Sequence, residues 1–100
     1  MSLSEIAAHA RSLPGVRQQE CDGLLGWYVD HRLVARQEDA TTLVVRADFP
    51  ERERLLTEHP GTFSVPPRME GHQKVLADLT RGEPAAVRRA VTEAWELQRR

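Results

Sequence analysis

Arginine side chains supply almost all of the positive charge in this sequence, and they offer its clearest chemistry. Of the 14 basic residues, Lys74 is the only one that is not Arg. A guanidinium group can hold a phosphate through two parallel hydrogen bonds, whereas a lysine ammonium acts as a point charge. An Arg-rich surface would therefore suit a phosphate-bearing partner, although a GC-rich genome gives the same bias in composition.

Five cations could gather on one surface if the chain folds as its pattern predicts. They lie in a predicted β-meander and around the last predicted strand, and they are Arg32, Arg36, Arg46, Arg68 and Lys74. Together with Tyr28 they would form a β-ribbon facing a major groove, where Arg can contact guanine or phosphate. The alternative is structural, because charges across strands keep an exposed sheet soluble and prevent edge pairing.

Residues for other kinds of chemistry are present but not in useful arrangements. The four His residues lack the i, i+4 spacing of a helical metal site. Cys21 lies between Glu20 and Asp22, whose negative charge disfavours the thiolate that a nucleophile needs. The glutamates in 51–58 and 93–96 have the spacing of a solvated helix face rather than of a catalytic pair. The sequence therefore predicts a non-enzymatic protein without a metal or cofactor.

Composition limits the class of protein. The sequence has 100 residues, of which 40% are hydrophobic and 29% are charged, as is typical of one soluble globular domain spanning 1–100. Its net charge of −1 gives no overall positive field, so nucleic acid would have to bind a local patch. The single Cys excludes an internal disulfide and favours a cytoplasmic location. Because no apolar stretch has the length of a signal peptide or a membrane span, neither export nor membrane insertion is expected.

Apolar spacing and turn signals predict the elements that would position the cations. Ser2 and Glu5 have the spacing of a capping box, in front of a helix that ends at Pro14. Short connections then permit only antiparallel neighbours among four β-type runs, which are 16–21, 24–30, 32–36 and 41–47. A second helix from Pro50, a fifth strand at 74–79 and a third helix after Gly82 and Pro84 complete the pattern.

This order, α-ββββ-α-β-α, predicts an α+β fold. We expect an antiparallel sheet of about five strands, covered on one face by the N-terminal, middle and C-terminal helices. Along 42–47 the alternation turns Val45 toward the core and Arg46 toward the solvent. Trp27 and Tyr28 alternate in the same way, so one of the two rings should lie on the solvent side.

The segment PPRMEGHQK at 66–74 interrupts the last apolar runs and is interpreted mainly as a turn. Its two prolines keep the chain extended and remove two backbone donors, and Gly71 permits a reversal into the next strand. Only Arg68, His72 and Lys74 would then be left for a partner.

The last third of the chain also carries a fairly specific series of motifs. The stretch TFSVPPRMEGHQKVLADL at 62–79 is followed by VRRAVTEAWELQ at 87–98. Phe, a Pro-containing turn, a Gly-His step, a strand and a last helix ending in Ala-Trp occur in the same order in the MmcQ/YjbR family, which this chain resembles. The matching residues are Phe63, Pro66, Gly71, His72, Val75, Leu76, Leu79, Ala94 and Trp95.

The N-terminal half is similar to the same family, with Leu-Pro-Gly-Val at 13–16 leading into a hairpin. It departs from the family at 30–32, where Asp-His-Arg replaces the Gly-Lys turn that relatives commonly have. The resemblance implies an α+β domain whose β-hairpins form a double wing, similar in outline to frataxin-like and secretion-chaperone-like domains. It also implies DNA binding.

We therefore expect a small domain that binds nucleic acid, chiefly double-stranded DNA, weakly and through phosphates, with the five cations as its contacts. The alternative is a protein-interaction or dimerisation module that uses an exposed sheet face or edge near Trp27 and Tyr28. A third possibility is a small-ligand or enzyme pocket between the sheet and the last helix.

Overall fold

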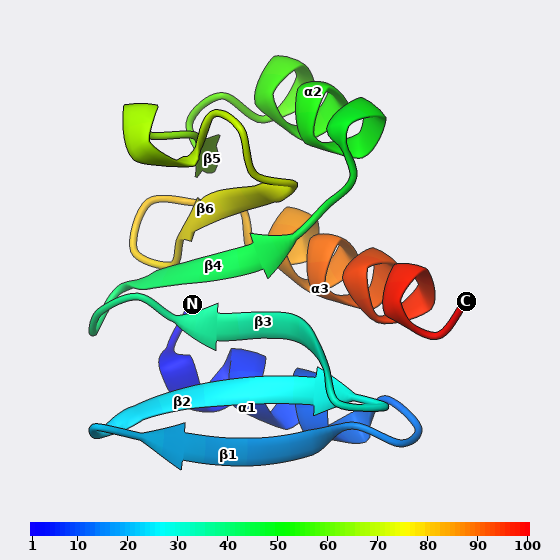
Figure 1. The fold of residues 1–100 in the computed structure, drawn as a ribbon. Coiled ribbons are helices and arrows are strands. Elements are labelled where there is room, and N and C mark those ends of the chain that lie inside the picture. The colour runs from blue at the N-terminus through cyan, green and yellow to red at the C-terminus, as the bar shows by residue number, and fades with distance from the viewer.

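The structure is a computed structural model that describes all residues 1–100, and it is an α+β fold (Figure 1). Its elements are α1 (Leu3–Ser12), β1 (Arg17–Cys21), β2 (Leu24–Val29), β3 (Arg32–Gln37), β4 (Thr42–Arg46), α2 (Phe49–Glu58), β5 (Phe63–Ser64), the 3-10 turn η1 (Pro67–Met69), β6 (Lys74–Asp78) and α3 (Pro84–Gln98). One antiparallel sheet has the strand order β1-β2-β3-β4-β6-β5. The fold class is confirmed, and β5 adds a sixth strand to the five that were expected.

Capping side chains fix where the helices begin. The Ser2 hydroxyl accepts a hydrogen bond from the Glu5 N–H at 3.1 Å, which is one of the two bonds of the predicted capping box. The Asp48 carboxylate caps α2 in the same way, at 3.1 Å from the Glu51 N–H. Proline occupies the first turn of both α2 and α3, where its missing N–H costs nothing.

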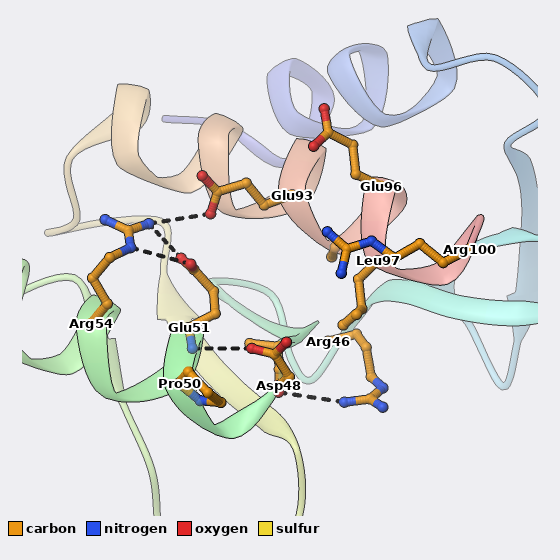
Figure 2. A pocket seen from close by; sticks show the side chains of 11 residues that line it. Arg46, Asp48, Pro50, Glu51, Arg54, Glu93, Glu96, Leu97 and Arg100 are labelled. Atoms are coloured by element: carbon orange, nitrogen blue, oxygen red, sulfur yellow. Dashed lines mark hydrogen bonds and ion pairs between the residues drawn. The ribbon is translucent and has the colours of Figure 1, made fainter.

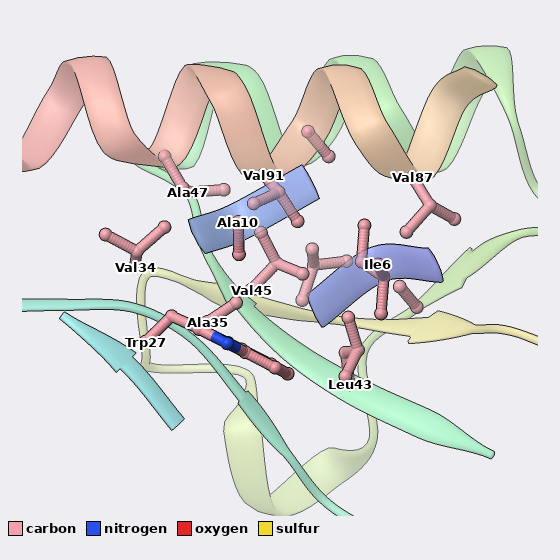
Figure 3. Close-up of a cluster of buried hydrophobic side chains, with 14 of the residues drawn as sticks. Ile6, Ala10, Trp27, Val34, Ala35, Leu43, Val45, Ala47, Val87 and Val91 are labelled. Atoms are coloured by element: carbon pink, nitrogen blue, oxygen red, sulfur yellow. The ribbon is translucent and has the colours of Figure 1, made fainter. Parts of the chain in front are cut away.

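Helices α1 and α3 lie against one face of the sheet, and α2 lies beyond the end of β4, close to β5 (Figure 1). Their apolar sides form a single cluster of 21 buried residues with the inward side chains of the strands (Figure 3). Trp27 is fully buried there, and Leu55 carries α2 into the same cluster. Trp95 joins it from α3 and donates its indole N–H to the Pro14 carbonyl at 2.8 Å.

The strand register separates a helix-covered face from an open face. Trp27, Ala35, Val45 and Val75 lie side by side on neighbouring strands, and all four belong to the core. The adjacent row must therefore point away from the helices. That row crosses all six strands and consists of Gln19, Gly26, Arg36, Val44, Leu76 and Ser64. We call this side the open face.

The segment 65–73 folds back over the β4 and β6 part of the open face. Figure 3 shows the yellow-green η1 turn on the opposite side of the sheet from α3. Val44 has no exposed surface although it points away from the helices, and Met69 of η1 is buried as well. Both lie outside the main cluster. The turn thus covers half of the open face and leaves the β1, β2 and β3 half uncovered.

Candidate nucleic-acid interface

Four of the five predicted cations lie on the open face or at its rim. Arg36 belongs to the row described above, and Arg46 is the register partner of Lys74 on the neighbouring strands. Arg68 projects from η1 and forms an ion pair with Glu38, just beyond the end of β3. The fold therefore brings together side chains that are up to 38 positions apart in sequence, between Arg36 and Lys74.

Arg32 is separated from these four by a β-bulge. Strict alternation would place Arg32 and Arg36 on the same face. The register shifts by one residue between Trp27 and Tyr28, so Val34 and Ala35 are both buried and the alternation inverts. Arg32 consequently reaches the C-terminal end of α3, where it donates to the Gln98 carbonyl at 3.3 Å and the Arg100 carbonyl at 3.0 Å. It lies there as a cap on α3, away from the open face.

The four remaining cations differ in how strongly they are already engaged. Glu38 accepts ion pairs from both Arg36, at 3.2 Å, and Arg68, whose side chain is still 61% exposed. Arg46 donates to the Gln73 carbonyl at 2.6 Å. Lys74 makes no hydrogen bond or ion pair within the protein. A phosphate could bind Lys74 directly, whereas it would compete with Glu38 for the two arginines.

Arg52 of α2 fixes the segment that carries Arg68 and Lys74, and the sequence interpretation did not include it. Its guanidinium donates to three backbone carbonyls of the segment, those of Met69, Glu70 and His72, at 3.3, 3.0 and 2.7 Å. Although charged, Arg52 is buried, and its guanidinium carbon also lies 4.9 Å from the centroid of the Phe49 ring. The spacing i, i+3, i+4 from Arg52 to Leu55 and Leu56 was the available signal that it points inward.

Tyr28 is the aromatic side chain on the solvent side, and Trp27 is fully buried. A partner surface near these two positions would therefore use Tyr28 alone. Arg17, which was not predicted as a site residue, is the register partner of Tyr28 on β1 and makes no hydrogen bond or ion pair. The pairing of β1 with β2 through the Asp22-Gly23 turn was the signal that could have placed it there.

A groove of about 410 Å³ between α2 and α3 is a second candidate site (Figure 2). Arg54 lies between two carboxylates there, forming ion pairs with Glu51 and, at 3.2 Å, with Glu93. Burial tends to raise the pKa of Glu51, but the hydrogen bond from Arg54 opposes it, and on balance the pKa of Glu51 is lowered. The pKa of Glu93 is raised, by burial and by the adjacent Glu51. Because Arg54 already binds both carboxylates, these ion pairs link α2 to α3.

The histidines that have side-chain partners also link elements. His59 at the end of α2 bonds Glu83 before α3 at 2.6 Å, and His9 of α1 bonds Thr92 of α3 at 2.9 Å. No group of three or more His, Cys, Asp or Glu side chains is arranged to hold a metal ion. None of the helices is both long enough and apolar enough to cross a membrane.

Comparison with protein-family models, with curated proteins and with solved structures found no match for this chain. The resemblance to the MmcQ/YjbR family therefore rests on the sequence motifs alone and stays a prediction.

Proposed function

We propose that this protein is a nucleic-acid-binding domain whose open face contacts phosphates through Arg36, Arg46, Arg68 and Lys74. The observation that supports the proposal most directly is the register, which places cations of β3, β4 and β6 on one helix-free face with η1 adding Arg68. Arg32 is not part of the proposed surface, because it caps α3.

The local charge of this face favours an anionic partner although the whole chain has a net charge of −1. Among the carboxylates near the four cations, Glu38 is paired with two of them. The Asp78 carboxylate accepts hydrogen bonds from the N–H groups of Thr80 and Arg81, at 2.8 and 3.0 Å. Because the four cations outnumber these two carboxylates, the face is locally basic, and a basic patch rather than overall charge would attract the phosphates.

The shape of the sheet favours contact with the sugar-phosphate backbone over insertion into a groove. Six strands at a spacing of about 4.8 Å make a surface about 24 Å wide, and a major groove is about 12 Å wide. The four cations lie on β3, β4, β6 and on η1, which folds over the β4 and β6 part of this face, rather than on a projecting two-stranded ribbon. Phosphate contacts of this kind give weak binding with little sequence preference.

A polarisation titration of fluorescently labelled duplex DNA, repeated at several salt concentrations, tests the proposal. Four phosphate contacts predict that log K falls against log salt with a slope of about −3.6. The variant Arg68→Glu/Lys74→Glu should bind more weakly, and its slope should be smaller in magnitude by about 1.8. No salt-dependent binding by the folded wild-type protein would refute the proposal.

The matched control is Arg88→Glu/Arg89→Glu, which makes the same change in net charge on the exposed side of α3. Neither of these side chains forms an ion pair in the structure. The control should keep most of the affinity and the full slope, because its residues lie on the helix-covered side. If both double variants lose binding equally, the effect is one of total charge, and the open face is not the binding surface.

Self-association through the β1 edge is the second candidate function. Every residue of β1 is exposed, and the strand pairs only with β2, so one row of backbone donors and acceptors has no partner strand. The opposite edge, β5, has only two residues. Sedimentation equilibrium over a range of protein concentrations tests this candidate: dimers that persist as salt is raised would support it, and a monomer throughout would exclude it.

A further inference from the structure

The uncovered half of the open face contains two hollows separated by the Tyr28 ring. Within this half, Gly26 of β2 lies between Gln19 of β1 and Arg36 of β3 in the six-strand row, and it has no side chain. Tyr28 leans over this position, since a Cβ placed on Gly26 would lie 2.9 Å from the Tyr28 Cε2 atom and 3.1 Å from its hydroxyl oxygen. Tyr28 lines a hollow of about 300 Å³ toward the Asp22 turn and another of about 680 Å³ toward the Asp30-His31 turn.

The smaller hollow combines apolar, aromatic and cationic groups. Leu24, which is 37% exposed, lines it together with Cys21, Tyr28 and Arg36. The Tyr28 hydroxyl makes no hydrogen bond within the protein, so it remains available to a ligand. Arg17 lies directly across from Tyr28 and has no partner either. A flat aromatic ligand attached to phosphates would match these groups.

We infer that Tyr28 stacks against an unpaired base, so that the preferred ligand of the open face is single-stranded nucleic acid. This inference rests on the proposed phosphate binding and adds the part of the ligand that phosphates do not supply. A duplex keeps its bases stacked inside, whereas a single strand can place a base on an exposed aromatic ring. Arg17 and Arg36 lie on the two strands adjacent to Tyr28, where they can hold the phosphates on either side of the stacked base.

Charge complementarity across the two hollows fits this ligand. Arg17 lines the larger hollow and Arg36 the smaller one, so each side of Tyr28 has one guanidinium. The carboxylates are at the two turns, where Asp22 lines the smaller hollow and Asp30 the larger one. A backbone that runs past Tyr28 between the arginines would meet the cations, and the acids at the turns could accept hydrogen bonds from base N–H groups.

Three labelled probes of about 12 nucleotides test the inference in one polarisation experiment: an oligothymidine strand, a strand of the same length made of abasic residues, and a duplex. Wild-type protein should bind the oligothymidine about 5- to 150-fold more tightly than the abasic strand for one stacked base. Tyr28→Leu should reduce this ratio to about 1 without changing the salt slope, and Tyr28→Phe should preserve it. Affinity for the duplex should be insensitive to Tyr28→Leu.

A second variant guards against a folding defect in the first. Gly26→Ala displaces only the outer end of the flexible Tyr28 ring, so it should fold normally and still lower the ratio. Equal binding of the base-bearing and abasic strands by wild type, with salt dependence intact, would overturn the stacking inference and leave the phosphate-binding proposal standing. A ratio that survives both Tyr28→Leu and Gly26→Ala would also overturn it. Absence of binding to all three probes at low salt would refute the proposed function itself.

Discussion

Replacing Arg52 with Met should remove the hydrogen bonds that hold the segment 65–73 against α2, and it should lower both the free energy of unfolding and the affinity for nucleic acid. Met keeps most of the volume and the unbranched stem of Arg but cannot donate hydrogen bonds. Three backbone carbonyls, those of Met69, Glu70 and His72, would lose a charged donor. Since Arg68 lies in η1 and Lys74 follows the segment, the proposed phosphate contacts would lose their fixed positions.

The size of the effect follows from the contacts. The two shorter hydrogen bonds, at 3.0 and 2.7 Å, each contribute about 1.5 to 3 kcal/mol, as bonds from a charged donor. The cation–π contact with Phe49 adds about 0.5 to 1 kcal/mol. The Arg52 Nε atom is buried without a partner, which costs about 1 to 3 kcal/mol and is relieved in the variant. The expected net loss in the free energy of unfolding is about 3 kcal/mol.

Urea denaturation followed by tryptophan fluorescence measures this loss, because Trp27 and Trp95 both lie in the core. Thermal unfolding should show a decrease in Tm of about 12 to 24 °C for a domain of this size. The matched control, Arg89→Met on the exposed side of α3, should change the free energy of unfolding by less than about 0.5 kcal/mol. A loss below about 1 kcal/mol for Arg52→Met, equal to that of the control, would refute the view that Arg52 holds the segment.

Three further variants test other parts of the fold. Trp95→Ala should lower the free energy of unfolding by roughly 3 to 5 kcal/mol in urea denaturation, because the ring is 8% exposed and its N–H is bonded to Pro14; a loss below about 1 kcal/mol would mean that α3 is misplaced. Asp30→Asn/His31→Gly should raise the free energy of unfolding by about 1 kcal/mol, since both residues have a positive φ, 50° and 64°, in a two-residue hairpin. An unchanged Tm would contradict the view that these two residues strain the backbone of the hairpin. Burial, together with the charge of Arg88, lowers the pKa of His9, and the hydrogen bond to the Arg88 carbonyl opposes this shift. The unfolded state therefore binds more protons than the folded state as pH falls below about 6.5. The free energy of unfolding, measured by urea titration, should decrease there in wild type and should not in His9→Gln.

Regular strands with short connections explain why the sheet could be predicted from sequence. In β4 and β6 the alternation has no irregularity, so Val45 was correctly placed inside and Arg46 outside. The β-bulge in β3 is different, because no turn residue or glycine marks it, and it appears only when both Val34 and Ala35 have to fill the core. One inserted residue was enough to move Arg32 to the helix side.

β5 could not be predicted for a different reason. Two residues are too few to show a period, and Phe63–Ser64 becomes a strand only because β6 offers an unpaired edge. The prediction of a turn at 66–74 was correct in kind, since η1 and its flanking loop occupy that segment. Its direction was not predictable locally, because it depends on the three carbonyls that Arg52 binds from another element.

The division of the open face into a covered and an uncovered half separates stability from binding. On the covered half, Val44 and Met69 are buried, so substitutions there must change the free energy of unfolding. On the uncovered half, Arg17 and Tyr28 have no hydrogen-bond partner to lose. If that half serves only to keep the sheet soluble, Arg17→Gln and Tyr28→Leu should change neither stability nor binding. A loss of affinity at constant Tm would instead mean that β1, β2 and β3 are left uncovered for a ligand. The η1 turn, which covers the β4 and β6 half, shows that this chain can cover a sheet face when no ligand has to reach it.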